Sequence, residues 1–170
     1  TERLLELLAI PSAIGVPVHP TALPEPARGE VVFNHVSFNY PSRPDHPALD
    51  QFSLVAQPGE KIALVGPSGA GKSTVFQLLL RFYDPSEGVI QLDNVDLREA
   101  DPTLVRACIG LVPQEPVIFA ADAWENIAYG RPDASREVIR AAAEAAAAAE
   151  FLDLQPEGFD TFLGEKGVRL

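Results

Sequence analysis

A glycine-rich run, Gly66-Pro67-Ser68-Gly69-Ala70-Gly71-Lys72-Ser73-Thr74, constrains the fold of this chain more than any other feature. It lies between the apolar residues 61–65, which have the character of a short buried strand, and residues 74–82, which have the pattern of a helix. Glycines let such a loop turn backbone N–H groups inward, and the following helix adds the positive end of its dipole. The run therefore predicts a phosphate-binding loop, with an ordinary glycine-rich turn as the alternative.

Two side chains of this run suit the binding of a nucleotide. Lys72 offers a movable positive charge for the β and γ phosphates, and the Ser73 hydroxyl can coordinate Mg²⁺. We therefore expect a nucleoside triphosphate to bind here together with Mg²⁺. The expected contact residues are Gly66, Pro67, Ser68, Gly69, Ala70, Gly71, Lys72, Ser73 and Thr74.

The overall charge and the cysteine content exclude several other kinds of partner and compartment. Lys and Arg number 13 against 24 Asp and Glu, which gives a formal net charge of −11. This charge argues against nucleic acid and against bulk attraction to an anionic membrane surface. No apolar run reaches the roughly 18 residues of a membrane span. Cys108 has no partner for an internal disulfide, so exposure to the cytosol is the better expectation.

Strands and helices are both predicted along the rest of the chain. Alternating or continuous apolar patterns predict strands over residues 30–39, 52–56, 89–92 and 109–112. Helical patterns cover residues 102–108, 123–129 and the alanine-rich stretch 135–151. The combination predicts an α/β domain with some antiparallel sheet.

Residues 1–29 are expected to lie outside this domain. Leucines at helical spacing in residues 1–10 predict the end of an amphipathic helix, and repeated prolines in residues 11–29 are typical of an extended linker. The boundary is therefore placed near Gly29, with the domain itself over residues 30–170. The start at Thr1 and the absence of methionine suggest a piece of a longer polypeptide.

A carboxylate that could hold Mg²⁺ for hydrolysis is not apparent in the sequence. Asp93 follows an apolar strand, but Asp93-Asn94 is typical of a turn in which the side chain bonds its own backbone. No other apolar strand ends in Asp or Glu. The histidines His19, His35 and His46 lie apart, so we expect no histidine metal site.

Taken together, these residues resemble the nucleotide-binding domain of ABC transporters, in particular the exporter type in which it follows a transmembrane domain. Residues 38–45 (FNYPSRPD) are similar to the family segment whose aromatic ring stacks on adenine, which would make Tyr40 that residue. A tyrosine that simply packs at a strand end is the alternative. Residues 112–119 (VPQEPVIF) resemble the Q-loop, in which Gln114 would contact Mg²⁺ and the attacking water. An exposed loop amide is the alternative there.

The resemblance also implies which fold the chain has and which parts of that fold it contains. It implies a P-loop NTPase of the ABC ATPase type, incomplete, with the antiparallel β subdomain, part of the parallel core sheet and the start of the helical subdomain. Residues 160–167 are similar to the exporter loop that touches the transmembrane coupling helices, and residues 1–8 to the helix that leaves the last membrane span. The signature LSGGQ would begin at Leu170, so the catalytic glutamate is expected beyond it. We expect weak Mg-ATP binding without hydrolysis.

The implied function is that of an ATP-driven exporter subunit at the cytoplasmic face of the cell (inner) membrane, with the chain itself soluble. Its implied partners are a transmembrane domain and a second nucleotide-binding domain that together with the first sandwiches ATP. A GTPase or kinase is disfavoured because Lys61, Lys72 and Lys166 lie in no Asn-Lys-x-Asp setting and no arginine-rich lid is visible. A nucleotide-sensing module without a transport role stays an alternative.

Overall fold

The computed structural model describes residues 14–164 of the chain, which divides after Leu111 into two units that we describe separately. The predictions for residues 1–10 and for residues 165–170 fall outside the described part. The first unit contains β1 (Val31–Asn39), β2 (Pro47–Ala56), α2 (Lys72–Leu79), β3 (Glu87–Leu92), β4 (Val95–Asp96) and α3 (Pro102–Ala107). The second contains β5 (Ala121–Asp122), α4 (Ala123–Ala128), α5 (Arg136–Ala145), α6 (Ala149–Asp153), the 3₁₀ turn η1 (Gly158–Asp160) and β6 (Phe162–Leu163).

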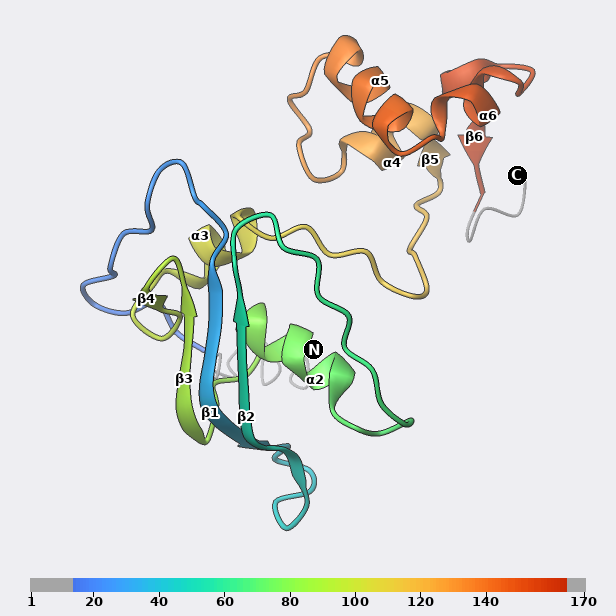
Figure 1. Ribbon diagram of the computed structural model, residues 1–170. Coiled ribbons are helices and arrows are strands. Elements are labelled where there is room, and N and C mark those ends of the chain that lie inside the picture. The colour runs from blue at the N-terminus through green and yellow to red at the C-terminus, as the bar shows by residue number, and fades with distance from the viewer. Residues whose placement is uncertain (1–13, 165–170) are drawn as a thin grey trace, which may run out of the picture. The chain divides into compact units, whose positions relative to one another are not determined.

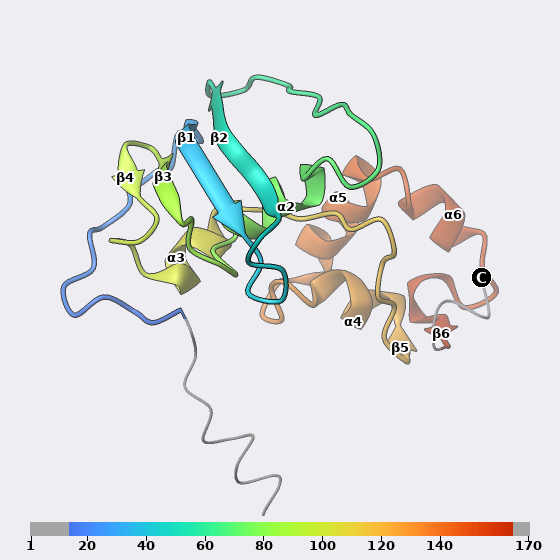
Figure 2. The ribbon, with the colours of Figure 1, turned by 90° about the horizontal axis from the view of Figure 1, so that it is seen from below.

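An antiparallel sheet with strand order β2-β1-β3-β4 forms the scaffold of the first unit, and α2 lies beside it (Figures 1 and 2). Phe33, Val36 and Ile90 of the sheet pack with Val75 and Leu78 of α2 in a buried apolar core. Burial of this apolar surface is the main force that holds α2 to the sheet. The antiparallel sheet expected from the sequence is therefore present.

Two bulges change which face of the sheet the β1 residues occupy. Strict alternation predicts that Phe33 and Val36 lie on opposite faces, yet both are buried in the same core. Between Phe33 and Val36 the pairing with β2 slips by one residue, and His35 takes a φ of 48° there. Gln51 of β2 has a φ of 47° at the next slip. An inserted residue at each slip reverses the alternation, which brings Phe33 and Val36 into the same core.

Two predicted strands, residues 61–65 and 109–112, do not form in the structure. Both segments are free of helix and strand, and Val65 and Val112 are 89% and 93% exposed. A short apolar strand is stabilised by the hydrogen-bond ladder with its neighbour. Within residues 14–164 no strand pairs with either segment. Their apolar character favours a strand, but the described residues do not provide the ladder that would order them.

The C-terminal end of α2 is tied to the region of α3 by two arginines. Arg106 donates to the carbonyl oxygens of Leu80 and Arg81, each at 2.9 Å. The Arg81 side chain is buried and donates to the Ala100 carbonyl at 2.9 Å. Helix ends leave carbonyls without intrahelical partners, and these contacts satisfy two carbonyls that follow the last turn. The helix ends at Leu79, three residues before the predicted end, because Arg81 has a φ of 50°.

The carboxylate of Asp93 binds the segment before β1 to the turn between β3 and β4. Its oxygens accept from the backbone N–H groups of Arg28 at 2.7 Å, Gly29 at 3.2 Å and Glu30 at 2.9 Å. Its own N–H donates to the Glu30 carbonyl at 2.8 Å. The predicted turn at Asp93-Asn94 is present, with φ values of 50° and 67°. The side chain, however, bonds the distant backbone of residues 28–30, rather than its own.

The alanine-rich helix of the second unit is broken in two. Residues 135–151 were predicted as one helix, but α5 ends at Ala145 and α6 begins at Ala149. Ala147 has a φ of 55°, and the Ala148 N–H donates to the Ala143 carbonyl at 2.8 Å, which is the geometry of a helix-ending motif. The bend places residues of both helices in one buried cluster, whose members are Ala123, Ala143, Ala149, Leu152, Phe159 and Leu163.

Stacked rings and arginines consolidate this second cluster. Trp124 of α4 stacks on Phe159 of η1 with ring centroids 4.4 Å apart. Arg136 lies 5.0 Å over the Trp124 ring, and Arg140 lies 5.3 Å over the Phe159 ring. Such cation–π contacts attract the guanidinium to the face of the ring. The second unit thus has a small core of its own, separate from that of the sheet.

Candidate nucleotide site

The glycine-rich loop reaches α2 through backbone conformations that only glycine adopts easily. Gly69 has a φ of 81° and Gly71 a φ of 82°. A Cβ at Gly71 would lie 2.3 Å from the Ala48 carbonyl oxygen, so the loop passes directly against β2. Gly71 is also the N-cap of α2, and no side chain caps this helix. The first N–H groups of α2 are therefore left for a ligand, as an anion-binding helix start requires.

Lys72 folds back over the loop and binds its carbonyl groups. The Lys72 Nζ donates to the Gly66 carbonyl at 2.8 Å and to the Pro67 carbonyl at 2.7 Å. A lysine ammonium has three donors and no acceptor, so it has one donor beyond these two contacts. The charge is thus held over the loop whose N–H groups were predicted to face a phosphate. This arrangement fits an anionic oxygen ligand.

Ser73 and Thr74 have different environments although they are adjacent. Ser73 is exposed at the start of α2, as a side chain must be to reach a bound cation. Thr74 is 4% exposed, and its Oγ1 lies 3.0 Å from the hydroxyl of Tyr40. The Ser73 hydroxyl therefore fits the predicted Mg²⁺ contact. The Thr74 hydroxyl instead faces a protein neighbour.

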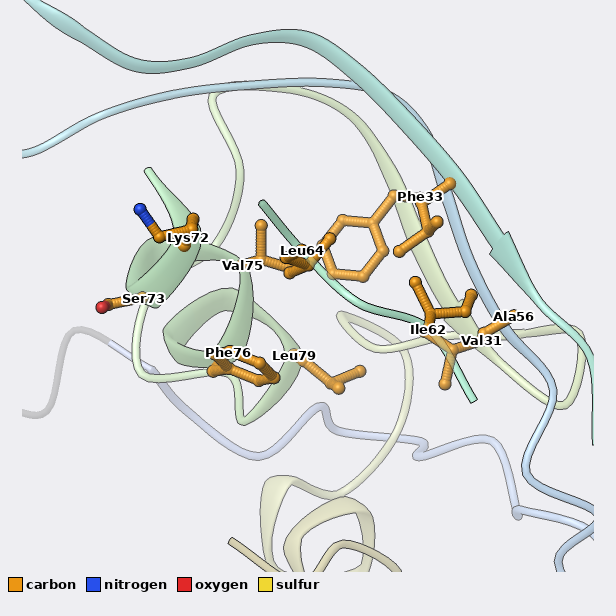
Figure 3. A pocket seen from close by; sticks show the side chains of 11 residues that line it. Val31, Phe33, Ala56, Ile62, Leu64, Lys72, Ser73, Val75, Phe76 and Leu79 are labelled. Atoms are coloured by element: carbon orange, nitrogen blue, oxygen red, sulfur yellow. The ribbon is translucent and has the colours of Figure 1, made fainter. Parts of the chain in front are cut away.

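An apolar groove of about 410 Å³ runs from the loop along α2. Figure 3 shows Phe33, Leu64 and Val75 lying together, while the polar atoms of Lys72 and Ser73 point away from them. The remaining lining residues are Val31, Leu54, Ala56, Ile62, Phe76 and Leu79. The polar end of α2 is thus separated from its apolar flank.

Tyr40 lies against α2 in the same unit as the loop. It follows the last residue of β1 and turns the chain, since the Arg43 N–H donates to the Tyr40 carbonyl at 2.8 Å. Its ring meets those of Phe38 and Tyr83 edge-on, with centroids 5.0 and 5.5 Å away. The Tyr40 hydroxyl donates to the Gln77 Oε1 at 2.9 Å. The structure therefore brings together Tyr40 and α2.

Gln114 belongs to the second unit, where it is exposed in a segment without helix or strand. The loop that follows is shaped by Asn126, whose amide donates to the carbonyls of Phe119 at 3.1 Å and Asp122 at 2.9 Å. Phe119 stacks on Tyr129 with centroids 4.5 Å apart. Of the predicted loop 160–167, residues 160–164 are described, and they run from η1 into β6.

Gln77 is the residue near the site that sequence reasoning missed. It lies on α2 one turn after Ser73, where the sequence pattern predicts a helix and nothing more. Its contact with Tyr40 joins residues 37 positions apart, and no short motif signals such a pair. The spacing of Ser73 and Gln77 on one helix face was the available signal. Within residues 14–164 no three or more His, Cys, Asp or Glu residues lie together in a group that could hold a metal ion.

Comparison with known proteins identifies the family. Residues 49–163 match the family model described as ABC transporter, and the chain belongs to this family. The chain is 41% identical, with a TM-score of 0.89, to a bacterial Atm1-family ABC exporter whose structure was determined with ATP bound. That match covers 99% of this chain and 29% of the other. The expected P-loop fold of the ABC ATPase type is thereby confirmed.

Curated relatives support the same family. The chain is 52% identical over 144 residues to the mitochondrial potassium channel ATP-binding subunit of Xenopus tropicalis, a match over 84% of this chain and 21% of that protein. It is 46% identical over 150 residues to ABC transporter B family member 1 of Arabidopsis thaliana, over 88% of this chain and 12% of that protein. The chain thus spans less than a quarter of the length of these two relatives. Among the described residues, no helix is long and apolar enough to cross a membrane.

Proposed function

We propose that this chain is the phosphate- and adenine-binding part of the ATPase domain of an ABC exporter, which couples ATP binding and hydrolysis to transport. The observation that carries the proposal is the uncapped start of α2 beneath the glycine loop, with the Lys72 ammonium held over the loop carbonyls of Gly66 and Pro67. A helix start with free N–H groups and an adjacent ammonium favours an anionic ligand. Family membership makes ATP the anion to expect.

The proposed roles follow from the positions of the side chains. Lys72 would exchange its carbonyl acceptors for oxygens of the β and γ phosphates, and the exposed Ser73 hydroxyl would be a ligand of Mg²⁺. Mg²⁺, when bound, supplies charge neutralisation on the phosphates. Tyr40 offers its ring to adenine. Gln114 is proposed to contact Mg²⁺ and the attacking water.

The proposed partners lie outside the chain. A transmembrane domain and a second nucleotide-binding domain would complete the exporter, and the parent protein would act at the cytoplasmic face of the inner membrane. The similarity to a bacterial ABC exporter that was solved with ATP bound supports this proposal. No nucleic acid partner is proposed, since the net charge of −11 opposes it.

We further propose that the chain binds ATP without hydrolysing it. Hydrolysis needs a carboxylate or an equivalent base beside the γ phosphate. The candidate at the end of β3, Asp93, is engaged by the backbone N–H groups of residues 28–30. Phosphate release should therefore not exceed that of a Lys72→Ala variant. Turnover of the chain clearly above that variant would contradict this part of the proposal.

Isothermal titration of Mg-ATP into the chain tests the binding role. Lys72→Ala should weaken binding at least tenfold, because a charge-assisted contact with phosphate is removed. Lys61→Ala, which removes an exposed lysine outside the loop, is the matched control and should bind like the unchanged chain. Equal affinities for Lys72→Ala and Lys61→Ala would refute the proposed site.

A further inference from the structure

The hydroxyl of Tyr40 is the centre of a hydrogen-bonded chain that ends on α2. It lies 3.0 Å from the Thr74 Oγ1 and donates to the Gln77 Oε1 at 2.9 Å. A phenol has one hydrogen, so when it donates to Gln77 the Thr74 hydroxyl must donate to the phenol oxygen. The three groups therefore form one directed chain, from Thr74 through Tyr40 to Gln77. Thr74 is 4% exposed, so little water competes for its hydroxyl.

The remaining contacts of Tyr40 restrict the same ring from other sides. Phe38 and Tyr83 meet it edge-on at 5.0 and 5.5 Å, and its backbone is fixed by the turn that Arg43 closes. Edge-on packing limits where the ring can lie, and the hydroxyl contacts fix how far it extends along α2. The ring is thus held by packing at its body and by hydrogen bonds at its tip.

The tip of the ring is attached to the helix that also carries the phosphate residues. Thr74 directly follows Ser73, and Gln77 lies one helical turn further along α2. The Tyr40 hydroxyl is therefore hydrogen-bonded to two residues of α2 that lie close to the phosphate loop. The distance between a bound base and the bound phosphates is limited by the nucleotide, so a ring set in advance relative to α2 lowers the ordering cost of binding.

We propose that Gln77 and the Thr74 hydroxyl are positioning residues that set the Tyr40 ring for the adenine base relative to the phosphate loop. This inference rests on the proposed function, because it takes Tyr40 as the adenine platform. It goes further by assigning a role to Gln77, which touches no phosphate in the proposal. It also gives Thr74 a role as a link between the adenine platform, Tyr40, and the phosphate loop.

The test compares two ligands that share phosphates and differ in the base. Mg-ATP carries adenine, whereas Mg-tripolyphosphate carries none, and both are titrated into the full 170-residue chain. Gln77→Leu removes the acceptor of the Tyr40 hydroxyl, and Tyr40→Phe removes the hydroxyl but keeps the ring. Each variant should weaken ATP about three- to tenfold, the worth of one or two hydrogen bonds, and leave tripolyphosphate unchanged.

Three further variants separate positioning from general damage. Gln77→Glu keeps an acceptor at the same place, so its ratio of ATP to tripolyphosphate affinity should return to that of the unchanged chain. The double variant Tyr40→Phe with Gln77→Leu should lose little more ATP affinity than either single variant, because both changes break the same series of hydrogen bonds. Gln57→Leu, in the exposed turn after β2, is the matched control and should leave both affinities unchanged.

The outcomes distinguish this inference from the function on which it rests. If the unchanged chain binds neither ligand, or Lys72→Ala binds both as well as the unchanged chain does, the proposed nucleotide site fails and the inference with it. If Lys72→Ala weakens both ligands but Gln77→Leu leaves the affinity ratio unchanged, the site stands and the positioning role is wrong. A selective loss of ATP affinity in Gln77→Leu, restored in Gln77→Glu, is the result that supports it.

Discussion

The Lys72 ammonium binds the carbonyl oxygen of Gly66 at 2.8 Å, which closes the glycine loop over the start of α2. Because the same ammonium also binds the Pro67 carbonyl at 2.7 Å, the loop keeps its shape through its own lysine. The Lys72 side chain thus lies back against the loop, so its positive charge is held beside these carbonyls and does not extend into solvent. Anionic oxygens of a ligand are hydrogen-bond acceptors for the Lys72 ammonium, as these two carbonyl oxygens are.

Replacement of Gly71 should damage both the fold and the site. In Gly71→Ala the added Cβ would lie 2.3 Å from the Ala48 carbonyl oxygen, at a φ of 82°. Gly69→Ala is the matched control, because its φ is 81° but nothing lies within 4 Å of the added carbon. The left-handed conformation costs about 1–2 kcal/mol in both variants, and the clash adds to it only in Gly71→Ala. Urea unfolding should rank Gly71→Ala clearly below Gly69→Ala; equal free energies of unfolding would show that the loop does not abut β2.

The contact of Asp93 with residues 28–30 should make stability depend on pH. Burial raises the pKa of Asp93, but the N–H donors of Glu30, Gly29 and Arg28, together with the Arg28 charge, leave that pKa below its ordinary value of 3.8. The carboxylate is therefore the form that the folded state prefers. Its stabilisation is present above the unfolded pKa and is lost as the pH falls from about 4 through the lowered folded pKa.

Asp93→Asn tests this pH dependence. The variant should be about 1–3 kcal/mol less stable than the unchanged chain at pH 7, because it loses charge-assisted hydrogen bonds. Its unfolding free energy should fall less steeply below pH 4, as measured by urea titration at several pH values. Asp45→Asn, at an exposed position in the turn after β1, is the control and should behave like the unchanged chain. Parallel pH profiles for Asp93→Asn and the unchanged chain would count against the contact.

The contact between Arg106 and the end of α2 should matter more than a surface ion pair. Arg106→Ala removes the donors to the Leu80 and Arg81 carbonyls, and each such bond to a charged group is worth about 1.5–3 kcal/mol. Arg98→Ala is the control, since Arg98 forms a surface ion pair with Asp96 at 2.8 Å that should contribute at most about 1 kcal/mol. Thermal unfolding should show the larger loss for Arg106→Ala. The reverse order would mean that these bonds do not stabilise α2.

Local signals in the sequence were sufficient where the structure is set by neighbouring residues. The glycine run predicted the loop and the helix after it, and Asp101 caps α3 by accepting from the Thr103 N–H at 2.8 Å, as its position before Pro102 indicates. The turn at Asp93-Asn94 was likewise predictable, because both residues tolerate positive φ. Such elements depend on contacts only a few residues apart.

Contacts between residues that are distant in the sequence account for the features that were predicted wrongly or missed. The bulge at His35 cannot be seen from alternation, and it brings Phe33 and Val36 of β1 into the same core. Residues 61–65 and 109–112 are apolar enough for strands, but a strand is completed by its neighbour. The link between Tyr40 and Gln77 joins a strand end to a helix middle, so only the fold reveals it. The roles proposed for Gln114 and Tyr40 stay predictions.

The central claim is that the loop closed by Lys72 binds the phosphates of Mg-ATP. Phosphorus NMR of Mg-ATP titrated with the chain tests this claim most directly, because it reports on each phosphate separately. We predict that the β and γ resonances shift or broaden with the unchanged chain and with Lys61→Ala, and not with Lys72→Ala. Equal perturbation by Lys72→Ala, or none by the unchanged chain at millimolar concentrations, would contradict it.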